Sequence, residues 1–204
     1  QSAHVFFNGE YLGMLNIRES NNRHYGYSNF GIDTDDMDQF DLSDAKYNQK
    51  VGDKEAWNQL VALSQQLASD KSAETYNQIC HLLDMNEYVN YMALECYLGN
   101  SDWVTNVNNV KGYRCRSNEG KFRFVLFDCD SAFGNNNMTN SLLNGSYSED
   151  VDDLFRNLMQ YAPFREQFVT AFSIVNGSVL HPDSCTSIVH AFYNNINPAL
   201  QFEG

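Results

Sequence analysis

Two short acidic segments of this sequence combine residue types that bind a divalent cation. The first segment begins at Asp102 and continues with three asparagines: Asn106, Asn108 and Asn109. The second segment contains Asp128 and Asp130 and directly follows the apolar run 122–127. Carboxylate and amide oxygens are the ligands that Mg²⁺ prefers in proteins. The two segments therefore predict a site for a hard divalent cation.

The order of these residues along the chain is that of a phosphoryl-transfer site. In such sites one Asp accepts or orients the proton of a substrate hydroxyl, and an Asn a few residues later binds a metal ion. A second Asp, after a hairpin, holds metal against the β- and γ-phosphates. The spacing here is looser than in ordinary protein kinases, whose His-Arg-Asp and Asp-Phe-Gly strings are absent.

A predicted buried helix positions the first segment. Asp84 is a candidate N-cap with Glu87 three residues later, and Gly99 is suited to the left-handed conformation that ends many helices. Apolar residues cover much of the circumference between them, which is typical of a buried helix. The polar loop that carries Asp102 is therefore expected to begin at a fixed place.

Two hairpins are predicted. The first joins 5–7 to 11–17 through an Asn-Gly turn, and because neither arm alternates cleanly we expect both faces to be covered. The second joins 110–116 to 121–127, and its nearly apolar second arm predicts a central strand. Because this hairpin links the two acidic segments, both are expected at one end of the same small sheet.

The remainder of the chain is predicted to be helical or irregular. Residues 21–52 are rich in Asp, Asn and Gly, so we expect a loop with one or two short helical turns. Asp53 is a candidate N-cap for the next helix. Helical periodicity predicts helices over these segments: 53–67, 73–83, 151–161, 164–175 and 183–196. The fold class that follows is α+β.

Composition restricts the partners of this chain. Hydrophobic residues make up 43% of it, enough for a buried core. Lys and Arg number 13 against 26 Asp and Glu, a net charge of −13, so we expect no nucleic-acid partner and no docking on anionic membranes. No apolar run is long enough to span a membrane. None of the five cysteines forms a Cys-x-x-Cys pair, which argues against a zinc site.

Three stretches together resemble the spore-coat protein H (CotH) kinase family. They are the first acidic segment with its following strand, 100–114, the second segment with its preceding strand, 122–134, and the first hairpin leading into 17–20. The helical stretch 154–168 is similar to the later helices of that family. The resemblance covers most of the chain in the family's order.

This resemblance implies an atypical protein kinase that uses ATP and Mg²⁺ to phosphorylate Ser or Thr, with a Ser/Thr-rich protein as substrate. Asp102 matches the catalytic Asp, and Asp128 matches the metal-binding Asp. Asn109 matches the metal-binding Asn, with Asn108 as the alternative. Asp130 is implied to support the metal.

The resemblance also implies a protein-kinase-like α+β fold in two parts. Residues 1–20 correspond to a remnant of the small lobe and the hinge, where Glu19 is implied to contact the nucleotide. Residues 21–204 correspond to the mostly helical large, catalytic lobe. No Lys precedes Lys46, so the small-lobe lysine that holds phosphates is missing. We interpret the sequence as a segment of a longer protein, and because the upstream part of the small lobe is missing we expect the segment to bind ATP weakly and to show little kinase activity.

A non-catalytic surface interaction or adhesion module on the same scaffold is the alternative function. The missing lysine favours this alternative, whereas the retained Asp102, Asn109 and Asp128 favour the enzyme. Low Lys content with abundant Asn, Tyr and Asp favours a secreted or cell-surface bacterial protein. The sequence indicates no oligomeric state.

Overall fold

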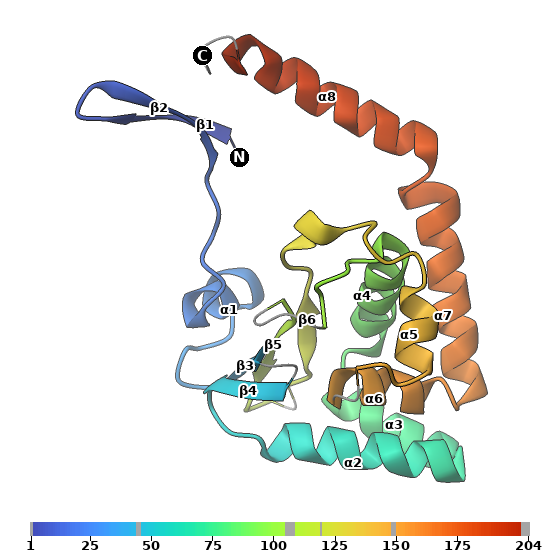
Figure 1. Ribbon diagram of the computed structural model, residues 1–204. Coiled ribbons are helices and arrows are strands. Elements are labelled where there is room, and N and C mark those ends of the chain that lie inside the picture. Colours follow the sequence, from blue (N-terminus) through green and yellow to red (C-terminus); the bar gives the residue numbers. More distant parts are fainter. Residues whose placement is uncertain (1, 44–45, 105–108, 119, 148–149, 201–204) are drawn as a thin grey trace.

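The computed structural model describes residues 2–43, 46–104, 109–118, 120–147 and 150–200. It has the expected α+β architecture, with two small antiparallel sheets and a larger helical part (Figure 1). The strands are β1 (Ser2–Phe7), β2 (Glu10–Asn16), β3 (Met37–Ser43), β4 (Lys46–Val51), β5 (Lys111–Cys115) and β6 (Arg123–Val125). The α-helices are α1 (Arg23–Phe30), α2 (Glu55–Asp70), α3 (Ala73–Leu82), α4 (Met85–Leu98), α5 (Met138–Leu143), α6 (Asp150–Leu158), α7 (Ala162–Ile174) and α8 (Pro182–Leu200). A 3₁₀ turn, η1 (Cys129–Ser131), follows β6, and a π-helical turn, η2 (Val175–Val179), links α7 to α8.

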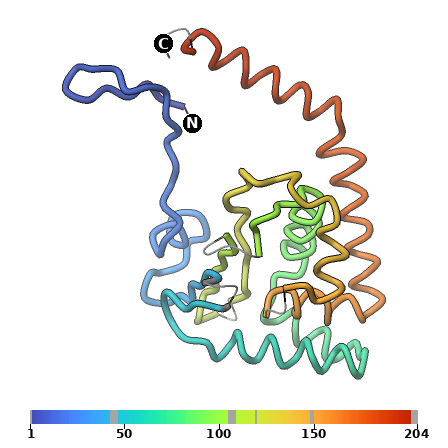
Figure 2. Tube along the Cα trace, in the orientation of Figure 1, coloured from blue at the N-terminus to red at the C-terminus, as the bar shows by residue number. Residues whose placement is uncertain are grey.

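The predicted first hairpin is confirmed as β1–β2. Asn8 and Gly9 have φ values of 51° and 86°, as its tight turn requires. The prediction that both of its faces are covered is wrong, because Phe6, Phe7 and Leu12 are 63%, 65% and 61% exposed. The hairpin projects from the molecule and is joined to it by a single extended segment, as the chain trace in Figure 2 shows.

The second sheet contains two strands that the sequence analysis predicted as loop. Its order is β4-β3-β5-β6, with all pairs antiparallel. Strand β3 lies inside the sheet, and its Phe40 and Leu42 are fully buried. The prediction was wrong because the polar residues of this strand, such as Asp38 and Asp41, lower the strand propensity of the segment. Pairing on both sides of β3 outweighs that low propensity.

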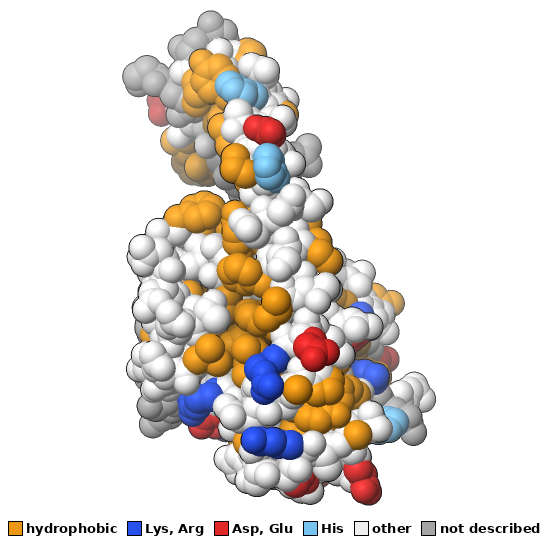
Figure 3. All heavy atoms as spheres, turned by 90° about the vertical axis from the view of Figure 1, so that its right-hand side faces the viewer, with side chains coloured by type: hydrophobic (Ala, Val, Ile, Leu, Met, Phe, Trp, Pro, Cys, Tyr) orange, Lys and Arg blue, Asp and Glu red, His pale blue; other side chains and the backbone are white. Residues whose placement is uncertain are grey.

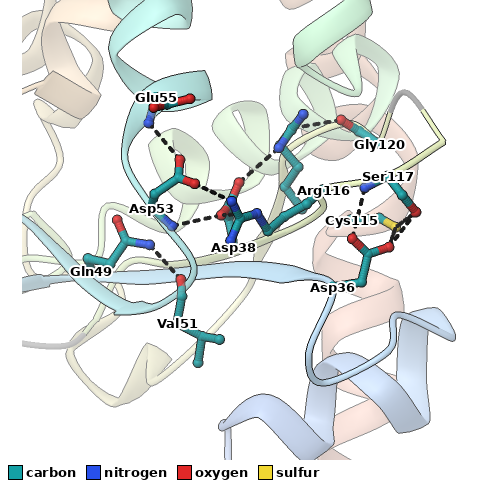
Figure 4. A network of polar contacts seen from close by, with 11 residues as sticks. Asp36, Asp38, Gln49, Val51, Asp53, Glu55, Cys115, Arg116, Ser117 and Gly120 are labelled. Atoms are coloured by element: carbon teal, nitrogen blue, oxygen red, sulfur yellow. Dashed lines mark hydrogen bonds and ion pairs between the residues drawn. The ribbon is translucent and has the colours of Figure 1, made fainter.

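Asp38 joins β3 to β5 and to the segment before α2. The carboxylate of Asp38 is fully buried and accepts a 2.8 Å hydrogen bond from Arg114 Nη1, while Arg116 lies 3.7 Å away. Asp38 also accepts from the backbone N–H of Asp53 at 3.0 Å. Figure 4 shows Asp38 between Arg116 and Asp53. A buried carboxylate needs such partners, since an unpaired charge in the interior is costly.

Two further expectations for this region need correction. Asp53 is not the N-cap of α2: the helix begins at Glu55 with Lys54 at the cap position, and Asp53 Oδ1 instead accepts from the N–H of Glu55. Strand β6 is an edge strand of its sheet rather than a central one. It is apolar because α4 covers it, with the rings of Tyr88 and Tyr91 each 5.2 Å from that of Phe124.

Helix α4 forms as predicted and occupies the centre of the helical part. The Asp84 side chain caps it by accepting from the N–H of Glu87 at 3.3 Å, and Gly99 ends it with φ 55°. It packs against α7 and β6, while α2 packs against α3 and α6. The helices predicted over 73–83, 151–161, 164–175 and 183–196 correspond to α3, α6, α7 and α8.

Helix α8 extends away from the helical part, and none of its described residues is buried (Figure 1). Apolar side chains form a band down the face of the molecule that lies to the right in Figure 1 (Figure 3). Exposed apolar residues of α7 and α8 include Val169, Ile174, Val189 and Phe192. Within the described ranges, no helix is both long enough and apolar enough to cross a membrane.

Candidate functional site

The end of α4 and the turn after β6 meet at Gly99. This glycine has φ 55°, and its carbonyl accepts a 2.8 Å hydrogen bond from the N–H of Asn135. A Cβ atom at Gly99 would lie 2.2 Å from the Asn135 carbonyl oxygen. Glycine is therefore required here both by the backbone conformation and by the close approach of the second loop.

Three hydrogen bonds join the loop of Asp102 to the loop of Asp128. Asn100 Nδ2 donates to the backbone carbonyl of Asp128 at 3.1 Å. The N–H and Oγ of Ser101 donate to the carbonyl of Ser131 at 3.1 and 3.4 Å. The structure thus places the two acidic segments in direct contact, at the end of the sheet formed by β5 and β6.

Asn109 lies against the same loop. It is buried, and its Nδ2 donates to the backbone carbonyl of Asp102 at 3.4 Å. The amide oxygen, Oδ1, is the atom of Asn109 with the chemistry of a cation ligand. The alternative residue, Asn108, lies outside the described residues.

The second loop carries two non-glycine residues in the left-handed conformation. Asp128, which is partly buried, has φ 50°, and Phe133 has φ 63° with its ring 74% exposed. Such conformations cost of order 1 kcal/mol or more and concentrate at functional sites. Asp130, in the turn η1, is exposed. The bond from Asn100 helps to hold the strained Asp128.

Negative charge is concentrated around Cys129. The pKa of its thiol is raised to about 11, mainly by burial. The nearby carboxyl groups of Glu95 and Asp128 raise this pKa further, and those of Asp102 and Asp130 raise it by smaller amounts. Four acidic side chains therefore lie near one point of the site, and the charges of three of them, Asp102, Asp128 and Asp130, favour a bound cation.

The structure adds a lysine to the site that the sequence analysis overlooked. Lys111 is buried on β5, with Nζ 4.5 Å from the centre of the Phe127 ring. Burial lowers the pKa of Lys111, an effect opposed by the carboxylates of Asp41 and Asp128. Lys111 lies after Lys46, whereas the resemblance implies a phosphate-binding lysine in the small lobe. The available signal was a lysine at the start of the predicted strand 110–116, two residues after Asn109.

Glu95 is a second residue whose importance was missed. It lies on α4 and is fully buried. Burial raises the pKa of Glu95 to about 8; the side chain of Asn100, in hydrogen-bonding reach, opposes the rise, and the charge of Asp102 adds to it. The sequence carried a signal here too, since Glu95 occupies an apolar face of a helix predicted to be buried.

Glu19, implied to contact the nucleotide, lies in the segment between β2 and α1. Its carboxylate is exposed and accepts a 3.2 Å hydrogen bond from Asn29 Nδ2. Its charge contributes to raising the pKa of Tyr25, after the larger effect of burial, and the Tyr25 ring stacks on Tyr113 at 5.8 Å. Within the described ranges, its hydrogen bond is to α1 and not to the two acidic loops.

The donor set of the two loops suits Mg²⁺. Among the described residues, no group of three or more His, Cys, Asp or Glu side chains is arranged to hold a metal ion. Phosphoryl-transfer sites do not need such a group, because one Asp, one Asn, water and the substrate phosphates complete the coordination. The carboxylate of Asp128 and the Oδ1 atom of Asn109 are ligands of this kind.

Comparison with known proteins decides the family. The family described as CotH kinase protein matches residues 1–203. The chain belongs to the CotH kinase family. The CotH match includes the first hairpin, both acidic loops and the helices α2 to α8, so the resemblance seen in the sequence is confirmed over essentially the whole chain. No curated protein matches this CotH chain. Membership of the family indicates a kinase-like function.

Proposed function

We propose that this CotH chain transfers the γ-phosphate of ATP to a Ser or Thr hydroxyl of a protein, in a reaction that requires Mg²⁺. The observation that carries the proposal is the 3.1 Å hydrogen bond from Asn100 Nδ2 to the carbonyl of Asp128. It joins the loop of the candidate base, Asp102, to the candidate metal ligand, Asp128. These two groups must act on the same phosphate.

Asp102 acts as the base that accepts or orients the proton of the acceptor hydroxyl. The residue is only partly buried, but its Oδ1 atom is buried, so we expect the acceptor hydroxyl to approach Oδ2. Asn109 fixes the backbone of this residue through its bond to the Asp102 carbonyl. A base held rigidly loses less activity to misalignment, because a displacement of about 1 Å can lower a rate by a factor of about 100.

Asp128 and Asn109 would hold the metal ion, with Asp130 supporting it. A bound Mg²⁺ would supply positive charge that offsets the negative charge of the phosphate being transferred. Lys111 supplies a fixed positive charge beside Asp128 and is suited to contact the nucleotide phosphates. Lys111 would thereby replace the small-lobe lysine, which is missing because no lysine precedes Lys46.

The arrangement of the chain into two parts belongs to the same proposal. Residues 1–20 act as the small-lobe side of the nucleotide site and as the hinge, and residues 21–204 act as the catalytic lobe. Glu19, in the segment after β2, contacts the nucleotide. A Ser/Thr-rich protein is the acceptor.

Transfer of radiolabelled phosphate from γ-labelled ATP to a Ser-rich protein tests the proposal. We expect Asp128→Ala to abolish transfer while circular dichroism and thermal unfolding stay as in the wild type, since the carboxylate is only partly buried. Asp183→Ala is the matched control, because the Asp183 side chain is 94% exposed and lies on α8. Wild-type transfer by folded Asp128→Ala would refute the assignment. Absence of transfer by the wild type would favour the interaction module.

A further inference from the structure

Three buried oxygen atoms behind the site have no hydrogen-bond partner among the described residues. They are Oε1 and Oε2 of Glu95 and Oδ1 of Asn100. Both residues are fully buried, and Asn100 lies within hydrogen-bonding reach of the Glu95 carboxyl. If Glu95 is ionised, all three atoms can only accept hydrogen bonds. None of them can then donate a hydrogen bond to another. Buried polar atoms without partners are strongly disfavoured.

A single proton resolves this conflict. If Glu95 is a neutral carboxylic acid, its O–H can donate to Asn100 Oδ1, which gives a partner to both residues at once. We propose that Glu95 is a positioning residue that donates this hydrogen bond and thereby orients Asn100 toward the carbonyl of Asp128. The inference rests on the proposed function, because it assigns Glu95 a role in aligning the metal ligand of that site.

The surroundings of Glu95 favour its neutral form. Asp102 is the acidic group whose charge acts on it, and Cys96, Cys129 and Tyr91 are the other titratable groups near it. None of these groups carries a positive charge. Trp103 Nε1 donates a 2.7 Å hydrogen bond to the hydroxyl of Tyr91, and both aromatic residues are buried. Tyr91 lies one helical turn before Glu95 on α4, so these buried rings help to exclude water from the Glu95 carboxyl group.

The orientation of Asn100 is the element that Glu95 controls. An amide side chain can rotate by about 180° and exchange its oxygen and nitrogen. With neutral Glu95 donating to Oδ1, Nδ2 points at the Asp128 carbonyl, as observed at 3.1 Å. An ionised Glu95 would instead attract Nδ2, and the left-handed backbone of Asp128 would lose its bond. The carboxylate that holds the metal would then lose alignment.

Two substitutions of similar volume test this role. Glu95→Gln keeps a neutral side chain whose NH₂ group can donate to Asn100 Oδ1, so we expect phosphate transfer and its Mg²⁺ dependence within about threefold of the wild type. Glu95→Leu removes the donor, and we expect the rate to fall roughly ten- to a hundredfold, with more Mg²⁺ needed for half-maximal rate. The midpoint of thermal unfolding should change little in Glu95→Leu, because the gain from an apolar side chain at a buried position is offset by leaving Asn100 Oδ1 without its donor.

These measurements separate positioning from a merely structural role. Lower activity in Glu95→Leu without lower stability, with recovery in Glu95→Gln, supports the proposal. Wild-type transfer and Mg²⁺ dependence in Glu95→Leu would overturn it, and so would a Glu95→Gln protein as impaired as Glu95→Leu.

A second measurement does not depend on activity. Carboxyl ¹³C NMR, with the Glu95 signal assigned by its absence in Glu95→Gln, should show a protonated carboxyl at pH 6.5. A carboxylate signal at that pH would overturn the inference. If the wild type transfers no phosphate, the proposed function fails, while the NMR result still decides the protonation and hydrogen bond of Glu95.

Discussion

The side-chain amide of Asn100 donates a 3.1 Å hydrogen bond to the backbone carbonyl of Asp128, 28 residues later in the chain. The donor lies just after the buried helix α4, and the acceptor lies just beyond the end of β6. Asn100 is fully buried, so no water replaces this bond if it is lost. Two elements that are distant in sequence thereby fix the residue that we propose as the metal ligand, Asp128.

Asn100→Asp tests the importance of this bond. The substitution preserves size but replaces the donor with an oxygen that faces a carbonyl, and we expect phosphate transfer to fall roughly ten- to a hundredfold. Asn140→Asp is the control, because within the described ranges the Asn140 amide donates to the exposed side chain of Asn137 and not to either acidic loop. Equal activities of the two variants in the radiolabel assay would show that Asn100 does not position Asp128.

Gly99→Ala tests the packing of the two loops. Gly31 is a matched control, since it also ends a helix with positive φ, 67° against 55° for Gly99. A Cβ at Gly31 meets nothing within 4 Å, so Gly31→Ala should cost only the roughly 1–2 kcal/mol of the left-handed conformation. At Gly99 the Asn135 carbonyl must also move, which adds about 1–3 kcal/mol. Denaturant unfolding measures the loss of stability in each variant. Equal losses of stability in Gly31→Ala and Gly99→Ala would contradict the contact between the two loops.

Lys111→Met tests the lysine of the site. If its ammonium group contacts the nucleotide phosphates, its loss should weaken Mg²⁺·ATP binding by roughly ten- to a hundredfold, the effect of one charge-assisted hydrogen bond. Lys50→Met is the control, because Lys50 is on the same sheet but its 40% exposed side chain pairs with Asp41 at 3.1 Å. Calorimetric titration that gives wild-type affinity for Lys111→Met would remove Lys111 from the site.

The raised pKa of Glu95 predicts a pH dependence of stability. Its value of about 8 lies above the ordinary 4.5, so between these pH values the folded protein holds a proton that the unfolded chain has lost. The free energy of unfolding contributed by this group is therefore complete below pH 4.5 and falls as pH rises towards 8. The slope approaches at most about 1.4 kcal/mol per pH unit.

The window from pH 7 to 8 isolates this effect. Glu87 also has a raised pKa, of about 7, mainly through burial, so it contributes to the slope at lower pH. Urea unfolding at several pH values should show a steeper loss of stability for the wild type than for Glu95→Gln. Parallel curves for the two proteins in this window would show that Glu95 does not titrate there.

The parts of the fold with strong local signals could be predicted from the sequence. The cap at Asp84, the apolar surface of α4 and Gly99 define a helix without tertiary information, and the Asn-Gly turn defines the first hairpin. Strand β3 could not be predicted in this way, because its polar residues, including Asp38, are stabilised by partners distant in sequence. Local propensity contains no information about such pairing.

The same distinction holds for the site. The two acidic loops could be found from residue type and order, since metal-binding residues must be carboxylates or amides placed after rigid elements. Glu95 and Lys111 could not be assigned a role, because their significance depends on what surrounds them after folding. A buried acid on α4 becomes important only when Asn100 and Asp102 lie beside it.

The location of a bound metal ion tests the central claim most directly. A crystal structure of the protein with Mn²⁺ and a non-hydrolysable ATP analogue would place the metal by its anomalous scattering. We predict that the metal is bound by the Asp128 carboxylate and Asn109 Oδ1 at roughly 2.1 Å, with Asp102 facing the γ-phosphate. A metal and nucleotide bound away from these residues, with Asp102 and Asp128 facing different surfaces, would contradict the account.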